Sequence, residues 1–566
     1  MSQQNLSKSD TSKKKDLALM LISKGEPGKA KAIYKELVDL GSKDHIVFCN
    51  LAALYGMEEN TSEMIRLLKR SIQLEPKFPD SYNNLAVGLL RQGDVSGAKA
   101  NLAKAIRLNP HYFDAHLNLG NLFKEQAELA KASASFQIAA SISPSRSDLY
   151  IEIGNLEKRQ GHTNNAINNY EKAIHCDPSQ PDFHNILGNT LREEGKLEEA
   201  IQSYKRALEI NPWNAHALNN MGGSMQEKGL IKDAIKYYLQ SLSADSNLCQ
   251  TQSNLAIALL LTGDYANGLT KYEYRFSGKK IREILVAEPL CKISNNKVIT
   301  SQAPTLLVAE QGLGDTLQFM RYINELRQQG INAQLCAQTK LHSLIRASGI
   351  DNSPLTPEEG NALSSGEWMP LLSILRYLNV SPGNPIINQA YISTTEDLKK
   401  KWKNILKNEK HPIIGINWQG NPSAEVGCLK GRSLRLEKFK LLTSIHKGVF
   451  LSLQKGFGAE QLETCDFKDQ FIKNQHLVNS TLDFLETAAI IENCDLIITS
   501  DTSVAHLSGG MGKPTWLLLH NSPDWRWGIE GDTTFWYQSM RLFRQSEKGN
   551  WNDVMIRVAE ELQKSL

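Results

Sequence analysis

The segment Pro178–Pro212 reads PSQPDFHNILGNTLREEGKLEEAIQSYKRALEINP, and its pattern decides the fold of the first half of the chain. A small residue, Gly188, is followed by a turn glycine, Gly195. An aromatic residue, Tyr204, comes later in the segment. Glycine permits a tight turn between two helices, and proline begins the next unit because a helix cannot continue through it. The segment therefore predicts one unit of two antiparallel helices.

The same pattern recurs every 34 residues along the chain. Prolines stand at Pro76, Pro110, Pro144, Pro178 and Pro212, and small residues stand at Ala52, Ala86, Gly120, Gly154, Gly188, Gly222 and Ala256. Aromatic residues stand at Phe136, Tyr170, Tyr204, Tyr238 and Tyr272. One helix pair cannot bury its apolar face alone, so the pairs must stack. We predict an all-α superhelix over residues 12–276, beginning with a partial unit, after a disordered tail at residues 1–11. The array resembles the tetratricopeptide-repeat (TPR) family.

Asparagines follow one face of the first helix of each predicted pair: Asn50, Asn84, Asn118, Asn155, Asn189, Asn220 and Asn254. Amide side chains can bind an extended peptide backbone without reading its side chains. The column resembles the asparagine ladder of the eukaryotic O-GlcNAc transferase, which implies a groove that holds an acceptor protein or peptide. The alternative is that asparagine is frequent in TPR sequences and is only tolerated here.

Composition excludes several classes of function. The net charge of +3 is too small to favour nucleic acid or an anionic membrane as a partner. No apolar run reaches the length of about 20 residues that a membrane span needs. The N-terminus lacks the apolar core of a signal peptide. The eight cysteines are scattered, without metal-ligand spacing. We therefore expect a cytoplasmic protein.

The repeat pattern ends after residue 276. Residues 277–304 are predicted to form a connector. From residue 305 short apolar runs alternate with helical stretches, which predicts a parallel sheet with crossover helices. Predicted strands lie at residues 305–309, 413–418, 449–453, 496–499 and 515–519. We expect two Rossmann-like lobes, at residues 305–393 and 394–566 with a C-terminal helix, in the arrangement called GT-B. Ligands of such sheets bind beyond the carboxyl ends of the strands.

An apolar strand runs into the segment Ser500–His506 and then into a helix. The free amides at a helix start favour an anion. Thr502, Ser503 and Val504 would supply donors there, while Asp501 could cap the helix or bind a ribose. The segment resembles the D-T-x-x-x-H element of bacterial heptosyltransferases, which implies a site for a nucleotide diphosphate. His506 could bond a phosphate oxygen or be packed inside the helix, and the whole segment could be a simple helix cap.

A second loop, Glu310–Asp315, follows the first predicted strand. Gly312 and Gly314 let the chain turn tightly and leave amides open to the cleft. Heptosyltransferases have a similar loop, and the resemblance implies that Asp315 is the base that deprotonates the acceptor hydroxyl. The competing interpretation is that Asp315 caps the helix that follows, and both roles could hold.

Basic residues of the second lobe could neutralise a leaving diphosphate. Arg432 resembles the residue that meets this group, and Lys455 could reach a phosphate. Glu460 could take the ribose. Lys455 and Glu460 could equally be solvated surface charges. No D-x-D sequence, the metal-binding mark of the other main glycosyltransferase fold, occurs in the chain, so we expect neither a metal nor a cofactor.

The tail contains aromatic residues with arginines, including Asp524-Trp525-Arg526-Trp527, which suit a sugar platform or, more simply, packing between the lobes. The combination of motifs resembles a bacterial family of TPR proteins with a heptosyltransferase-like domain. It implies a metal-independent glycosyltransferase that moves a sugar from a nucleotide sugar to an acceptor hydroxyl, with a protein as the expected acceptor. The alternatives are transfer to a surface polysaccharide precursor, or a TPR scaffold whose α/β domain is not catalytic.

Overall fold

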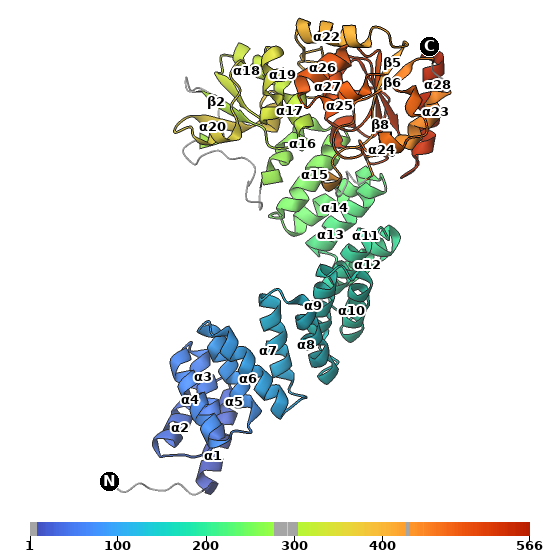
Figure 1. Ribbon diagram of the computed structural model, residues 1–566. Helices are drawn as coiled ribbons and strands as arrows, with labels where there is room; N and C mark the ends of the chain where they lie inside the picture. Colours follow the sequence, from blue (N-terminus) through green and yellow to red (C-terminus); the bar gives the residue numbers. More distant parts are fainter. Residues whose placement is uncertain (1–7, 277–290, 293–303, 426–430, 445–446, 566) are drawn as a thin grey trace. The chain divides into compact units, whose positions relative to one another are not determined.

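The computed structural model describes residues 8–276, 291–292, 304–425, 431–444 and 447–565 (Figure 1). The chain divides into two compact units, Met1–Ala217 and Leu218–Leu566. In the described residues no helix is both long and apolar enough to cross a bilayer.

The first unit consists of consecutive antiparallel helix pairs. Its helices are α1 (Lys8–Ser23), α2 (Pro27–Asp39), α3 (His45–Met57), α4 (Thr61–Leu74), α5 (Pro79–Arg91), α6 (Val95–Leu108), α7 (Phe113–Glu125), α8 (Leu129–Ile142), α9 (Ser147–Arg159), α10 (Thr163–Cys176), α11 (Pro181–Glu193) and α12 (Leu197–Ile210). Helix α13 (Ala215–Glu227) begins in this unit and ends in the next.

The second unit begins with further repeat helices and continues into an α/β region. Its repeat helices are α14 (Ile231–Ala244), α15 (Cys249–Leu261) and α16 (Tyr265–Tyr272). The later helices are α17 (Leu313–Phe319), α18 (Ile323–Gln328), α19 (His342–Ala347), α20 (Pro357–Asn361), α21 (Ile374–Tyr377), α22 (Glu396–Leu406), α23 (Lys440–Thr443), α24 (Gln461–Thr464), α25 (Gln475–Ser480), α26 (Phe484–Glu492), α27 (Ser503–Gly510) and α28 (Trp551–Ser565).

The small and aromatic columns of the repeats are in contact. A Cβ atom placed on Gly188 would lie 2.6 Å from the ring of Tyr204. The same holds in the neighbouring pair, where the distance from Gly154 to Tyr170 would be 2.4 Å. Where the small residue is Ala52, the residue at the aromatic position is Leu68. Glycine thus lets the rings of Phe136, Tyr170, Tyr204 and Tyr238 pack directly on the first helix, although Ala256 stands at the same position opposite Tyr272.

Replacing Gly188 with alanine is expected to destabilise the first unit by about 1–3 kcal/mol, because a packed core must shift to admit the new methyl group. Chemical denaturation of the full chain measures this change. Gly28→Ala is the matched control, since Gly28 also lies in a helix but a Cβ atom placed on it would have nothing within 4 Å. That exchange should leave stability unchanged or raise it slightly. Equal effects of the two variants would contradict the packing explanation.

Two predicted boundaries need correction at the N-terminal end. Helix α1 begins at Lys8, so the predicted tail at residues 1–11 is too long. Lysine and alanine are good helix formers, which extends the helix beyond its apolar positions. The first repeat is also a complete helix pair, α1 with α2, whereas a partial repeat was predicted. The predicted connector lies outside the described residues, apart from β1 (Cys291–Lys292) and Pro304.

The α/β region contains two parallel sheets. The first has the order β1-β4-β2-β3, with β2 (Thr305–Val308), β3 (Ala333–Cys336) and β4 (Glu367–Pro370). The second has the order β6-β5-β7-β8-β9, with β5 (Ile413–Asn417), β6 (Val449–Ser452), β7 (Leu496–Ser500), β8 (Thr515–Leu519) and β9 (Met540–Arg544). All strand pairs within the two sheets are parallel. The expectation of an α/β region with parallel sheets is confirmed.

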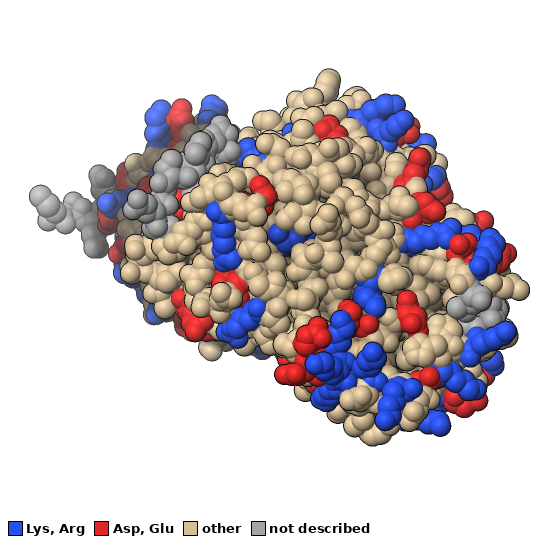
Figure 2. Space-filling view, turned by 90° about the horizontal axis from the view of Figure 1, so that it is seen from above, with Lys and Arg blue, Asp and Glu red and all other residues tan. Residues whose placement is uncertain are grey.

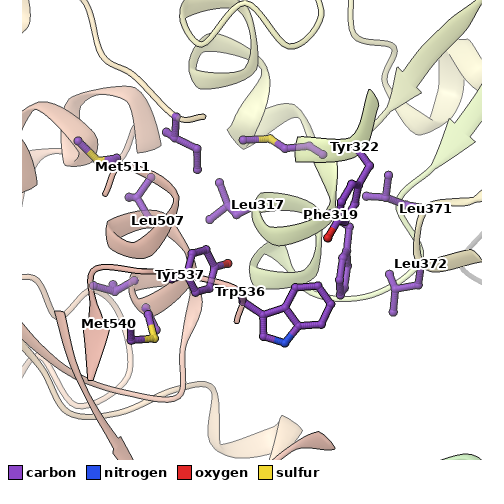
Figure 3. Close-up of a cluster of buried hydrophobic side chains, with 14 of the residues drawn as sticks. Leu317, Phe319, Tyr322, Leu371, Leu372, Leu507, Met511, Trp536, Tyr537 and Met540 are labelled. Atoms are coloured by element: carbon purple, nitrogen blue, oxygen red, sulfur yellow. The ribbon is translucent and has the colours of Figure 1, made fainter. Parts of the chain in front are cut away.

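An apolar cluster joins the two sheets through their helices. Helix α17 follows β2 and packs on α27, which follows β7 (Figure 1). Leu317 and Phe319 of α17 lie close to Trp536 and Tyr537 of the second lobe, and all four are buried (Figure 3). Burial of this many large side chains stabilises the contact strongly. The loops that follow β2 and β7 are therefore held close together.

The last repeat is joined to the first sheet by buried polar contacts. The guanidinium of Arg275 donates to Glu310 at 2.9 Å, in the loop after β2. The neighbouring Gln311 donates to the Tyr272 hydroxyl at 3.3 Å. Both Arg275 and Glu310 are buried, so loss of either side chain would leave the charge of the other unpaired in the interior. The end of the repeat array therefore supports the loop that leads to Asp315.

Candidate functional site

A cleft of about 800 Å³ lies at the carboxyl ends of β2, β5, β6 and β7. It is the position at which parallel sheets bind ligands. Ten residues singled out from the sequence line it: Gly312, Gly314, Asp315, Arg432, Lys455, Asp501, Thr502, Ser503, Val504 and His506. Residues that are more than 190 positions apart in the sequence, such as Asp315 and His506, thus line one cleft.

Asp315 both caps a helix and faces the cleft. Its Oδ2 accepts a hydrogen bond from the Gly312 amide at 3.0 Å, in the first turn of α17. Its Oδ1 accepts from Arg526. Burial raises the pKa of the Asp315 carboxyl, and the Arg526 charge opposes this. The capping role is confirmed, and the remaining lone pairs on each oxygen leave room for a proton acceptor role as well.

The start of α27 is open to the cleft. Thr502 is the N-cap residue, but its side chain accepts no hydrogen bond from the first turn. Its hydroxyl donates instead to Asn417 Oδ1 at 2.9 Å. Thr502, Ser503 and Val504 all line the cleft. An uncapped helix start with its amides and dipole directed to a cleft favours an anion.

Gly314 allows helices α17 and α27 to approach closely. A Cβ atom on Gly314 would lie 2.9 Å from Cδ2 of His506. The His506 Nδ1 is hydrogen-bonded to the Tyr537 hydroxyl at 2.9 Å, and its ring stacks on Trp527 at 5.4 Å. Burial and the nearby arginines lower the pKa of His506 well below its usual value. His506 is therefore a neutral packed residue whose edge reaches the cleft.

Arg432 presents its charge to the cleft with few protein partners. Its side chain is 16% exposed, and its nearest acid is Glu425, 3.8 Å from Nε. Nε has no hydrogen-bond partner among the described residues. A Cβ on Gly420 would lie 3.0 Å from Nη2, so a larger residue there would crowd the guanidinium. Of the arginines that line the cleft, Arg432 is the one whose charge is least used by the protein.

Lys455 is hydrogen-bonded within the protein, and Asp501 is buried. The Lys455 ammonium donates to the Thr481 hydroxyl at 3.1 Å and to the Val478 carbonyl. Burial lowers the pKa of Lys455 to about 8. Burial, with Asp524 nearby, raises the pKa of Asp501 to about 6. Both groups therefore change charge more readily near neutral pH than exposed side chains do.

Glu460 does not lie in this cleft. It lines a separate depression with Arg435 and Lys440. The chain turns at Gly456 and Gly458, which both have positive φ angles, and so carries Glu460 away from the end of β6. The predicted ribose contact of Glu460 is therefore wrong for this cleft.

Several cleft residues were not predicted from the sequence. Lys340 comes from the first lobe, and Asn417 ends β5. Gln454 accepts from the Asn417 amide at 2.9 Å and so joins the ends of β5 and β6. Polar residues directly after an apolar strand are a signal that could have indicated Asn417 and Gln454. The segment around Arg526 is predicted to form a sugar platform or to pack between the lobes; Trp525 and Trp527 are buried, which agrees with packing, and Arg526 also lines the cleft.

Charge on the face shown in Figure 2 is mixed. In Figure 2 acidic and basic side chains lie together toward the lower and right parts of the face, while its middle is mostly uncharged. This distribution gives no single-sign surface on the visible face that would attract a polyanion from a distance.

The asparagine column of the repeats is partly engaged within the array. Asn118 donates to Asn83 at 2.9 Å, and Asn254 donates to Asn219 at 3.0 Å. The other members of the column make comparable contacts: Asn50 with Tyr34, Asn84 with Cys49, Asn155 with Tyr170, Asn189 with Tyr204, and Asn220 with Asn219. The Oδ1 atoms of Asn84 and Asn254 also accept, from Asn83 and Gln250. The column is therefore bonded within the array.

Comparisons with known proteins identify the repeats. The family model described as TPR repeat matches residues 154–191 and 188–229, and the one described as tetratricopeptide repeat matches residues 83–147. No curated protein sequence matches the chain.

Among solved structures, YrrB, described as a TPR protein with an unusual peptide-binding site, is 20% identical. The match covers 32% of this chain and 95% of YrrB, with a TM-score of 0.29. The C-terminal part of a TPR repeat-containing protein from Cytophaga hutchinsonii is 12% identical, with 42% and 98% coverage and a TM-score of 0.38. PilF of Pseudomonas aeruginosa is 19% identical, with 37% and 95% coverage and a TM-score of 0.31.

The N-terminal region is thus an array of TPR repeats, and it is followed by a region of parallel sheets with flanking helices. TPR arrays generally bind proteins or peptides, which suggests a protein-interaction scaffold for this part of the chain.

Proposed function

We propose that the protein is a glycosyltransferase that moves a sugar from a nucleoside diphosphate donor to an acceptor hydroxyl. One observation carries the proposal: Asp315 lies in the same cleft as the open start of α27 and Arg432. A carboxylate suits the acceptor, and an open helix start with an arginine suits a diphosphate. The two parallel sheets with a cleft at their carboxyl ends fit the GT-B arrangement.

In the proposed reaction the acceptor oxygen attacks the sugar carbon of the donor. The acceptor hydroxyl proton passes to Asp315, a new carbon–oxygen bond forms, and the bond from sugar to diphosphate breaks with its electron pair on the phosphate. Arg432 and the amides of Ser503 and Val504 stabilise the leaving charge. We propose that these groups replace a divalent metal in this role. In this proposal Lys455 and Asp501, which line the cleft, contact the donor's phosphate or ribose.

The proposed acceptor is a protein held by the TPR array. Amide side chains can bind an extended backbone, and Asn118 and Asn254 belong to the column of asparagines that supports this proposal. A surface polysaccharide precursor is the second candidate acceptor. The proposal that the α/β region only recruits a partner, without catalysis, is the competing function.

Donor binding should persist in the presence of EDTA. We expect one of UDP-N-acetylglucosamine, GDP-mannose or ADP-glucose to raise the melting temperature of the full chain in excess EDTA. At 100-fold the dissociation constant, a ligand specific for the folded state contributes about 2.7 kcal/mol. Thermal unfolding measures the shift, and release of nucleoside diphosphate measures turnover. A strict need for added Mg²⁺ or Mn²⁺ would contradict the metal-independent mechanism, and binding without any turnover would favour the scaffold function.

A further inference from the structure

Arg526 is buried at the centre of the site and its guanidinium is divided among three protein groups. It lies in η9 (Trp525–Trp527), and its side chain is 6% exposed. Nε donates to Gln318 Oε1 at 2.8 Å and Nη1 donates to Asp524 Oδ1 at 2.7 Å. Nη2 donates to Asp315 Oδ1. A planar fork with three directed donors fixes the orientation of each acceptor.

Aromatic side chains hold Arg526 in place from both sides of the site. Its guanidinium carbon lies 4.7 Å from the ring centroid of Trp525 and 5.2 Å from that of Phe319. Trp525 in turn packs on Tyr272 of the last repeat, with ring centroids 5.8 Å apart. Cation–π contacts in a buried site restrict a guanidinium well. Arg526 therefore has little freedom to turn toward a bound phosphate.

The charges around Asp315 oppose one another. Burial raises the pKa of its carboxyl, the positive charge of Arg526 lowers it, and the negative charge of Asp524 raises it. Further ionisable groups line the same cleft: Lys340, Arg432, Lys455, Asp501 and His506. Among all of these, Arg526 makes the direct ion pair with Asp315.

We propose that Arg526 is the positioning residue of the base, holding the Asp315 carboxylate toward the acceptor and keeping it ionised. This inference rests on the proposed function and assigns Arg526 no contact with substrate. The pair has a defined chemical consequence. A general base works only when it is deprotonated, so turnover rises with pH through the pKa of that base. Removing Arg526 should therefore move the rising limb of the pH profile to higher pH.

The experiment compares pH profiles of the full chain. Release of nucleoside diphosphate from UDP-N-acetylglucosamine, GDP-mannose and ADP-glucose is followed from pH 5 to pH 9, with water as acceptor. For Arg526→Met we expect a loss of roughly 10²-fold at pH 6.5 that partly recovers at high pH. Asp524→Asn should shift the limb in the opposite direction, to lower pH, because it removes a negative charge near Asp315. That second variant keeps the test decisive if Arg526→Met fails to fold.

Arg321→Lys is the matched control. Arg321 is also buried at the junction of the lobes, and its guanidinium donates to the Trp536 carbonyl at 2.7 Å, without touching Asp315. This exchange should lower the melting temperature but should not shift the rising limb of the pH profile of turnover. Folded Arg526→Met and Asp524→Asn variants with unchanged profiles would overturn the positioning role alone. A wild-type protein that releases no nucleoside diphosphate from any probe would overturn the proposed function, and this inference with it.

Discussion

Asp315→Asn is expected to lower turnover by roughly 10²–10⁴-fold, the usual contribution of a general base. An acceptor hydroxyl is a poor nucleophile at neutral pH and needs a group that takes its proton. Asp315 is the acid placed at the start of α17, and it lines the same cleft as Arg432 and the start of α27. Asparagine has nearly the same size but cannot accept a proton under these conditions.

The same exchange also has a structural effect, which must be separated from the chemical one. Asp315 accepts hydrogen bonds from the Gly312 amide and from Arg526. An amide has one oxygen, so it can keep one of these contacts well but not both. We therefore expect a lower melting temperature as well. Turnover has to be expressed per folded molecule, with donor affinity measured separately.

A matched control for Asp315 exists in the same lobe. Asp351 is buried, accepts from the Leu335 amide at 2.8 Å and lies 3.2 Å from Arg327. Asp351→Asn should therefore cost comparable stability without changing turnover per folded molecule. If a folded Asp315→Asn protein kept wild-type turnover, Asp315 would have no part in the mechanism.

The sequence predicts the repeats well because their packing is local and periodic. Gly188 and Tyr204 lie 16 residues apart and belong to one helix pair, and the same contact recurs at Gly120, Gly154 and Gly222 in neighbouring periods. Four strands of the second sheet are also predicted, and β5 and β8 among them are buried apolar runs. The fifth strand, β9, is not predicted, because arginines interrupt its apolar residues. By contrast β3 and β4 each span four residues, and their mixed composition gives no clear signal.

From the sequence, the residues of the site can be predicted only where they come soon after the end of a strand. Asp315 and Thr502 come directly after loops that leave β2 and β7, so general rules for parallel sheets place them in the cleft. Arg526 contacts Asp315 across 211 residues, and nothing in its local pattern indicates that partner. Glu460 was predicted to lie in the cleft because it follows β6 in the sequence. The chain turns at Gly456 and Gly458, which have positive φ angles, and Glu460 lines a separate depression instead.

Replacing Arg432 with methionine is expected to lower turnover by roughly 10²–10³-fold, the typical cost of removing one preorganised group that stabilises charge in a transition state. The negative charge on the diphosphate grows as the bond to the sugar breaks. Arg432 can meet it because its guanidinium lines the cleft and its nearest acid is 3.8 Å from Nε. Lys455 is directed to Thr481 and Val478, so Lys455→Met should cost less.

Arg435→Met is the control for this prediction, because Arg435 is an exposed arginine three residues further along that lines the separate depression with Glu460. It should leave turnover unchanged. Steady-state release of nucleoside diphosphate gives kcat and KM for each variant, and the melting temperature monitors folding. A group that acts mainly on the leaving charge lowers kcat more than it raises the donor KM. An Arg432→Met protein with normal kcat and a raised KM would instead make Arg432 a ground-state binding residue.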